Sequence, residues 1–208
     1  MKKLIFSLIL ILWFGFCLAD VTYLRPDSDL DATPDWETTV PASPTTHYTK
    51  IDETSYSDAD YNSTKTLGKT DWFTLTDATG QITAGSTIDS VKITNRCKGD
   101  SDDDFNIQTH TIYYKIGSDS GNSNILPDQT TFTTQTSVIL GAPGGRTWSI
   151  ANLDSLVLTL RKDVAGVPAN EYHTYNFWLY VTVWWTAPSG AKANERRVKV
   201  LKLLSEDD

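Results

Sequence analysis

The stretch YHTYNFWLYVTVWWT, residues 172–186, is dense in β-branched and aromatic side chains. Successive side chains of a strand point to opposite faces. One face would carry the nearly continuous apolar set His173, Tyr175, Phe177, Leu179, Val181, Val183 and Trp185. The opposite face would mix polar groups with large aromatic rings: Tyr172, Thr174, Asn176, Trp178, Tyr180, Thr182 and Trp184. This alternation predicts a long strand of an antiparallel sheet, buried on one face and half exposed to water on the other.

Earlier segments of the chain show the same enrichment, which predicts strands at residues 21–25, 46–53, 71–77, 88–98, 105–117 and 156–161, and a strand or a pair of strands at residues 130–140. Gly, Pro, Asn and Asp cluster between them, as in residues 57–62 and 118–128, and these residue types favour turns. Residues 148–152 are expected to form a turn or one helical turn. No amphipathic helix of useful length occurs between residues 20 and 186. Roughly eight strands at fairly regular spacing indicate a β-sandwich or a β-barrel.

Alternation within these segments also predicts the core. The inward side chains are expected to be Phe73, Leu75, Val91, Ile93, Cys97, His110, Ile112, Tyr114, Ile116, Leu156, Leu158 and Leu160. Asn95 is the one polar member of the inward set in its segment. Lys92, Thr94 and Arg96 are expected on the outward face of the same strand. Trp36 is expected to pin the polar loop that follows Pro26 to the body of the domain.

The N-terminal segment MKKLIFSLILILWFGFCLAD has the features of a secretory signal peptide. Lys2 and Lys3 precede an apolar run, and Cys17-Leu18-Ala19 forms a small-x-small cleavage site. The alternative is an uncleaved membrane anchor, although the run is shorter than the roughly 18 to 20 residues of a spanning helix. We therefore expect residues 1–19 to be removed and the protein to be secreted, with no membrane span in the mature chain.

Charge and cysteine content limit the function classes. The formal net charge is −8, and no basic patch is evident in the sequence, which argues against a nucleic-acid partner because phosphate neutralisation supplies most non-specific affinity. After removal of the signal peptide only Cys97 remains, so the mature chain cannot form an internal disulfide. A buried, unreactive Cys97 is the expectation.

We place the domain at residues 20–186, and residues 187–208 differ from it in their pattern of apolar and charged residues. A short linker precedes NERRVKVLKLLSEDD, residues 194–208. Its apolar residues fit neither helical nor strand spacing along their whole length. Two alternatives remain, a surface tail and a segment that docks on another chain or on a sheet edge of this domain, because clustered aliphatic side chains are costly to expose. Docking of the tail on another copy of the chain would make the protein a homo-oligomer.

The order of short motifs resembles a known family. A strand ending in Leu24-Arg25-Pro26 is followed by an Asp-rich loop, by HYTKIDE (47–53), SDADY (57–61) and STIDSVKITNRCK (86–98), and then by Gly145-Arg146-Thr147-Trp148, LDSLVLTLRK (153–162) and the aromatic strand. Residues 20–186 resemble the jelly-roll β-sandwich modules, similar to concanavalin-type lectins and carbohydrate-binding modules, of bacterial, archaeal and phage extracellular proteins. The resemblance implies an all-β, two-sheet antiparallel jelly roll and a binding or structural role. It implies no fixed site.

Aromatic residues supply the candidate ligand-binding site. Trp178, Tyr180 and Trp184 would lie along one face of the last strand with Asn176 nearby, and Tyr113 on another strand could join them. Sugar rings present C–H groups to aromatic faces, and amide and hydroxyl groups add directional hydrogen bonds. This predicts an extracellular glycan or cell-surface polymer as the partner. The alternative is that a loop, the tail or a neighbouring subunit covers this face.

Acidic loops supply a candidate calcium site, made of Asp27, Asp29, Asp31, Asp100, Asp102 and Asp104. Calcium takes six to eight oxygen ligands. The spacing departs from an EF-hand loop, because neither the Gly nor the final Glu is present. The alternative is that these aspartates simply form solvated turns.

No catalytic pattern emerges, so we expect a protein that is not an enzyme. His47, His110 and His173 show no metal-ligand spacing, and no nucleophile elbow, P-loop or dinucleotide motif is present. Two functions follow. The first is a secreted carbohydrate-binding or adhesion module. The second is a structural subunit of an extracellular filament, surface layer or virion-like assembly, in which the tail docks on a neighbour.

Overall fold

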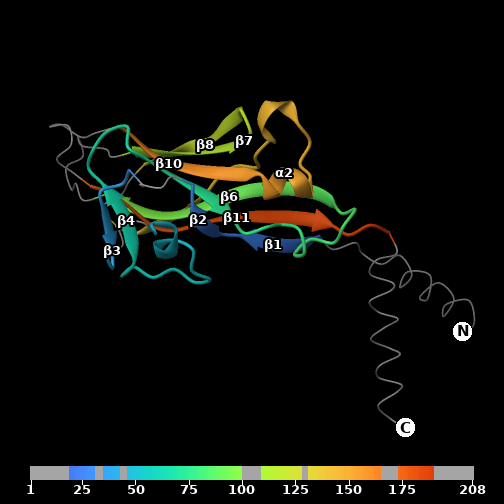
Figure 1. Ribbon diagram of the computed structural model, residues 1–208, viewed down its shortest axis with the longest axis horizontal. Coiled ribbons are helices and arrows are strands. Elements are labelled where there is room, and N and C mark those ends of the chain that lie inside the picture. Colours follow the sequence, from blue (N-terminus) through green and yellow to red (C-terminus); the bar gives the residue numbers. More distant parts are fainter. Residues whose placement is uncertain are drawn as a thin grey trace, which may run out of the picture.

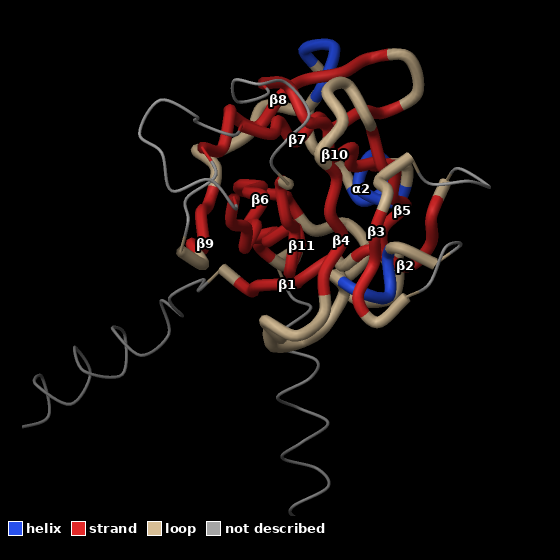
Figure 2. Tube along the Cα trace, turned by 90° about the vertical axis from the view of Figure 1, so that its left-hand side faces the viewer, coloured by secondary structure: helices blue, strands red, loops and turns tan. Residues whose placement is uncertain are grey.

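The computed structural model describes residues 19–30, 35–42, 46–99, 109–127, 131–164 and 173–189. Two antiparallel sheets lie over each other as two layers (Figure 1), and Figure 2 shows the same strands end-on, around the interior. None of the described residues belongs to a helix of the length and apolarity needed to cross a bilayer. Residues 1–18 of the predicted signal peptide and the tail beyond residue 189 lie outside the described residues.

Sheet A consists of β1 (Asp20–Leu24), β3 (Thr38–Val40), β4 (Tyr61–Thr64), β6 (Thr87–Gly99), β9 (Thr133–Thr136) and β11 (Thr174–Thr186). Sheet B consists of β2 (Pro26–Asp29), β5 (Thr70–Leu75), β7 (Thr109–Ile116), β8 (Asp119–Pro127) and β10 (Leu156–Val164). Short helical turns are η1 (Tyr48–Lys50), η2 (Pro143–Gly145) and α2 (Ile150–Asp154). The oxygen of Ser149 accepts from the N–H of Asn152 at the start of α2, which confirms the expected single helical turn there.

The strand pairs are nested in the sequence. β1 pairs with β11, β5 with β10, β6 with β9 and β7 with β8, and all these pairs are antiparallel. The resulting orders are β1–β11–β6–β9 in sheet A and β5–β10–β7–β8 in sheet B. A long hairpin rolled up in this way is a jelly roll. The predicted all-β, two-sheet antiparallel jelly-roll β-sandwich is therefore confirmed.

The core lies between the sheets and contains the side chains that alternation predicts. Val91, Ile93 and Cys97 of β6 are at most 2% exposed, and Leu158 and Leu160 of β10 are fully buried. Phe73, Leu75, Ile112, Ile116, Leu156 and Leu153 join the same buried set. Burial of each such side chain contributes about 1.5 to 3 kcal/mol. Trp36 is 2% exposed, so the loop that carries it is anchored as expected.

A β-bulge in β11 changes which residues face the core. Asn176 pairs with Cys97 and Trp178 pairs with Arg96, so Phe177 is the extra residue. Leu179, Val181 and Val183 face inward as predicted and are fully buried. Before the bulge the alternation is reversed, since Thr174 and Asn176 are fully buried. The predicted outward position of Asn176 is therefore wrong.

The same bulge leaves His173 and Tyr175 only half-buried. Tyr175 and Phe177 contact each other, and Phe177 also contacts Phe132, which is 39% exposed. The ring of His173 lies 5.7 Å from that of Tyr175. The inward positions predicted for His173 and Tyr175 are wrong, because alternation alone cannot reveal an inserted residue. Phe177 is buried as predicted, at 1% exposed.

Two further segments differ from prediction. Residues 46–53 contain η1 instead of a strand, because both carboxylate oxygens of Asp29 accept backbone N–H groups, from His47 and Tyr48, and hold the turn. Residues 118–128 contain β8 instead of turns alone, because this segment pairs with β7 on both sides of one register shift.

A buried polar network holds one end of the interior together. Asp71 is fully buried, and one of its oxygens accepts the backbone N–H of Trp36 at 2.9 Å. Its other oxygen lies 2.6 Å from Nδ1 of His47, which is itself buried. The carbonyl of His47 accepts from the side-chain amide of Asn62 at 2.9 Å. These contacts tie the loops that precede β3 and η1 to both sheets.

Replacing Asp71 by alanine is expected to lower the free energy of unfolding by about 3 to 5 kcal/mol, because His47 and the Trp36 N–H lose their buried acceptor. Denaturant unfolding measures the change. Asp35→Ala is the control, because Asp35 pairs with Lys69 at 3.4 Å on the surface. The Asp35→Ala variant is expected to lose no more than about 1 kcal/mol of the free energy of unfolding. Equal losses for the two variants would contradict the role assigned to Asp71.

Candidate functional site

Four aromatic rings form a continuous row on the outer face of sheet A, and we call Tyr23, Tyr180, Trp178 and Tyr56 the aromatic strip. Adjacent ring centroids are 5.7 Å, 4.5 Å and 5.9 Å apart in that order. The strip crosses from β1 over β11 to the loop before β4. Tyr23 and Tyr56, at its two ends, are 49% and 52% exposed. The strip therefore presents apolar ring surface and phenolic hydroxyls to solvent.

The loop between η1 and β4 is fixed to the strip by backbone acceptors. The carbonyl of Glu53 accepts from Trp178 Nε1 at 2.7 Å and also from the guanidinium of Arg25. The carbonyl of Ile51 accepts from the backbone N–H of Leu179 at 3.0 Å, in the space between β1 and β4 along the edge of β11. These bonds orient the indole of Trp178 and position Tyr56 beside it.

Trp184 lies on the same face but outside the strip. It pairs across the strands with Val21, which is 42% exposed, and the ammonium of Lys92 lies 5.7 Å from its ring centroid. Thr182 separates Trp184 from Tyr180 on this face and is 6% exposed. Of the predicted ligand-binding residues, the structure thus places Trp178 and Tyr180 in contact and Trp184 further along the same strand.

Two predicted ligand-binding residues lie elsewhere. Tyr113 is on β7 of sheet B, where its ring lies 4.4 Å from the guanidinium carbon of Arg161 and its hydroxyl accepts from that group. It cannot join the aromatic strip, because the two sheets have opposite outer faces. Asn176 points into the interior, and both atoms of its amide group have no hydrogen-bond partner among the described residues.

Cationic side chains accompany the aromatic rings. The guanidinium of Arg96 lies 4.2 Å from the ring centroid of Tyr56 and 5.1 Å from that of Phe132. Asp58 accepts two hydrogen bonds from Arg96, at 2.7 Å and 2.8 Å, and this pairing raises the pKa of Arg96. The guanidinium of Arg25 lies 5.4 Å from the ring of Tyr180. Each cation can therefore gain about 0.5 to 1 kcal/mol from its ring.

Sequence reasoning missed several members of this face, namely Tyr23, Arg25, Tyr56, Lys98 and Phe132. Outward parity could have suggested Tyr23 and Lys98. Nothing local in the sequence indicates that Tyr56 or Phe132 lies beside β11, because both positions depend on long-range pairing. The outward positions predicted for Lys92, Thr94 and Arg96 agree with the cross-strand contacts of β6.

The described part of the predicted calcium site is committed to other contacts. Asp27 accepts the hydroxyl of Thr74 at 2.6 Å. Asp29 accepts two backbone N–H groups, and burial raises its pKa despite those bonds. Among the described residues no group of three or more His, Cys, Asp or Glu side chains could hold a metal. Asp31, Asp100, Asp102 and Asp104 lie outside the described residues, so calcium stays a prediction there.

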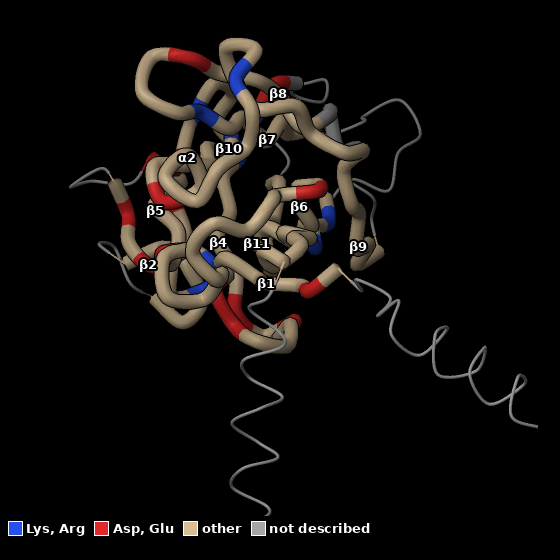
Figure 3. The backbone as a smooth tube through the Cα atoms, turned by 90° about the vertical axis from the view of Figure 1, so that its right-hand side faces the viewer, with Lys and Arg blue, Asp and Glu red and all other residues tan. Residues whose placement is uncertain are grey.

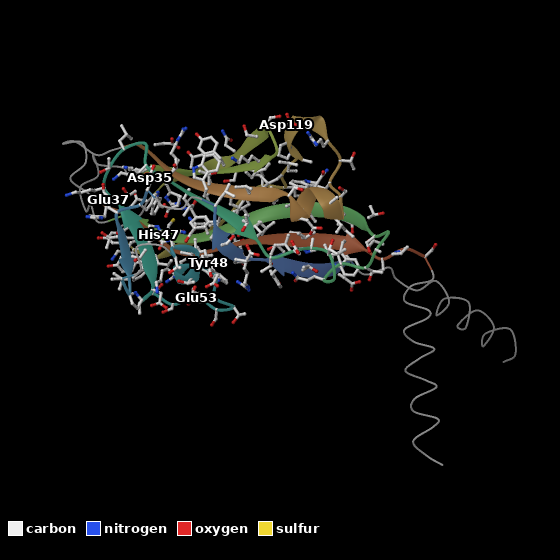
Figure 4. The ribbon with its side chains drawn as sticks, in the orientation of Figure 1. Asp35, Glu37, His47, Tyr48, Glu53 and Asp119 are labelled. Carbon is white, nitrogen blue, oxygen red and sulfur yellow. The ribbon has the colours of Figure 1, made fainter. Side chains whose placement is uncertain are left out.

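Glu53 is the carboxylate nearest the strip with a strongly altered pKa. Burial of its side chain, with smaller contributions from the charges of Asp52 and Asp60, raises the pKa to about 7. Its Oε2 has no hydrogen-bond partner among the described residues. Figure 4 shows Glu53 at the lower side of the molecule and Asp119 at the upper side, by β8. At neutral pH Glu53 therefore carries only part of a negative charge.

A separate recess of about 610 Å³ is lined by the loop at residues 79–84 together with Ile150 and Trp185. Trp185 is 8% exposed, and its Nε1 donates to the hydroxyl of Thr22 at 3.0 Å. The lining holds small, amide and apolar side chains and shares no residue with the aromatic strip. None of the predicted site residues borders it.

Comparison with known proteins gives little beyond this geometry. No family model matches the chain, and no curated protein matches it. A solved structure, the CBM36-1 domain of a multidomain xylanase from the hindgut metagenome of Trinervitermes trinervoides, aligns over 83% of this chain and 100% of that domain. The TM-score is 0.40 and the sequence identity 9%. The function must therefore be argued from the residues of this chain.

Glu53→Gln is expected to raise the melting temperature at pH 8 relative to the wild type and to leave it nearly unchanged at pH 4. A folded-state pKa of about 7, above the ordinary 4.5, means that the folded protein holds a proton that the unfolded chain has lost, so the wild type loses stability as the pH rises through this window. Thermal unfolding followed across pH 4 to 8 measures the difference.

The control is Glu37→Gln, for which the opposite sign is expected. Partial burial by itself would raise the pKa of Glu37. Hydrogen bonds from the Thr66 hydroxyl and the Lys65 backbone outweigh this and lower the pKa. Its stabilisation is therefore present above the ordinary pKa and lost as the pH falls. A Glu53 variant that behaves like the Glu37 variant would contradict the burial of Glu53 beside the strip.

Proposed function

We propose that the outer face of sheet A binds an extended carbohydrate chain without chemical conversion of it. The observation that carries the proposal is the aromatic strip, with its two ends half exposed. Aromatic faces contact the C–H patches of sugar rings, and the hydroxyls of Tyr23 and Tyr56 can hydrogen-bond to sugar hydroxyls. In view of the signal-peptide pattern at residues 1–19, the protein would act outside the cell, on a cell surface or an extracellular polymer.

The inclination of the rings favours a single twisted chain over a flat surface. Neighbouring rings of the strip are inclined by 71°, 52° and 59°. Coplanar rings would suit the flat face of a crystalline polysaccharide, whereas inclined rings can contact successive sugars that turn about the chain axis. The bonds from Trp178 and Arg25 to the Glu53 carbonyl hold the middle of the strip in place, so little side-chain entropy remains to be lost on binding.

Tyr23→Ala and Tyr56→Ala are each expected to weaken retention on a bound polysaccharide by about 2- to 10-fold, because each removes one stacking surface. Affinity electrophoresis of the full chain against a panel of soluble polysaccharides measures the retention. Tyr113→Ala is the control, since Tyr113 is an outer-face tyrosine of sheet B beside an arginine. Its retention is expected to equal that of the wild type. Equal losses for Tyr113→Ala and Tyr23→Ala would contradict the placement of the site on sheet A.

A structural subunit of an extracellular assembly is the second candidate, favoured by one exposed apolar pair. Val138 and Ile139 are 65% and 63% exposed. They lie at the edge of sheet A, because the N–H groups of Ser137 and Leu140 donate to carbonyls of β6. An aliphatic pair on an edge segment fits contact with a second copy of this chain.

If this pair mediates assembly, the double variant Val138→Lys, Ile139→Lys should convert an oligomer into a monomer in light scattering of the full chain. Leu67→Lys is the control, because Leu67 is 49% exposed and lies outside this edge. An unchanged mass for both variants would contradict the second candidate.

A further inference from the structure

We infer that the carbohydrate bound by sheet A is anionic, a polysaccharide bearing carboxylate or sulfate groups. This inference rests on the proposed function and adds the substrate class. It is carried by four cations that lie among the aromatic rings of the same face: Arg25, Lys92, Arg96 and Lys98. A neutral glycan would bring no counter-charge to Lys92 and Lys98.

Three of the cations come from one strand. The alternation of β6 places Lys92, Arg96 and Lys98 on the outer side, since Val91, Ile93 and Cys97 are buried. Figure 3 shows Lys and Arg positions in blue along β6. Lys92 and Lys98 are six residues apart, about 20 Å along a strand. A row of this length next to β11 suits a polymer with repeated charges better than a single sugar.

No acidic partner of Lys92 or Lys98 occurs among the described residues. Within the described residues neither Lys92, Lys98 nor Arg25 has a carboxylate oxygen within 4.0 Å, and only Arg96 forms an ion pair, with Asp58. The ammonium of Lys98 instead lies 4.9 Å from the ring of Phe132 and 5.3 Å from that of Tyr175. In a chain with 26 acidic and 18 basic residues, lysines that have no acidic partner in the described part of the chain are available for an external anion.

Sheet B provides an internal comparison. The two arginines on its side, Arg161 and Arg146, each pair with a carboxylate, Asp163 and Asp119. Lys115 lies 3.8 Å from the ring centroid of Trp72. A lysine close to an aromatic ring therefore occurs on sheet B as well. What distinguishes sheet A is that three outward cations, Lys92, Arg96 and Lys98, belong to one strand, β6.

The acidic net charge does not cancel this local field. At physiological ionic strength charges are screened beyond about 8 Å. Only carboxylates close to the four cations can therefore weaken their attraction for an anionic ligand. Asp58 is already paired with Arg96, and Glu53 is partly protonated at neutral pH. Asp52 and Asp60 belong to the loop that carries Tyr56. The ligand charges should therefore lie over the β6 lysines, while the sugar rings lie on the aromatic strip.

The test compares matched polymers that differ in charge alone, polygalacturonate with its methyl ester and dextran sulfate with dextran, using the full chain. The wild type is expected to bind the anionic member of at least one pair about 10-fold more tightly than its neutral partner, and to lose this preference as salt rises from 50 to 200 mM. Lys92→Gln with Lys98→Gln should weaken binding to that anionic polymer about 10-fold. The control Lys115→Gln should bind like the wild type.

The outcomes separate the two proposals. Equal binding to charged and neutral partners, with Tyr23→Ala still weakening it, would overturn the anionic class and leave carbohydrate binding intact. No retention on any polysaccharide would overturn both. Tighter binding to single-stranded poly(dT) than to either anionic polysaccharide would overturn the inference in favour of a nucleic acid. An equal loss for Lys115→Gln would show that the β6 row is not the site.

Discussion

The antiparallel pairing of β11 with β6, with its bulge at Phe177, is the constraint on which the site depends. The register places Trp178 opposite Arg96 and Tyr180 opposite Thr94. A shift of one residue would turn every side chain to the other face. The extra residue Phe177 shifts the alternation of β11 by one position, so that Asn176 lies in the interior and Trp178 on the outer face. Aromatic rings and cations then occupy neighbouring strands of one outer face.

A chain of polar contacts connects the buried network to this face. Asp71 holds His47 in the interior, and Asp29 holds the backbone of the same turn. From there the chain runs on to the Ile51 carbonyl, which accepts from β11, and the Glu53 carbonyl, which accepts from Trp178. The position of the exposed ring of Tyr56 therefore depends on hydrogen bonds of the buried Asp71 and the half-buried Asp29.

Alternation in the sequence predicted much of the fold and part of the site. In residues 88–98 it separated the buried Val91, Ile93 and Cys97 from the outward Lys92 and Arg96, because burial of one face only leaves a period of two in the chain. It failed where one residue is inserted, at Phe177. It also failed for Tyr113, because parity gives a face but not the sheet. The loop with Tyr56 carries no local signal, since its place is set by acceptors for Trp178 and Leu179.

Whether the polymer lies on sheet A can be read from the indole N–H resonances of a ¹⁵N-labelled chain. Trp178 Nε1 donates at the strip, whereas Trp72 Nε1 donates to Thr70 on sheet B and Trp148 Nε1 donates to the Leu140 carbonyl. On titration with short galacturonate oligomers, the Trp178 resonance is expected to shift while those of Trp72 and Trp148 stay in place. A shift of the Trp72 or Trp148 resonance with Trp178 unchanged would mean that the polymer does not bind to the aromatic strip of sheet A.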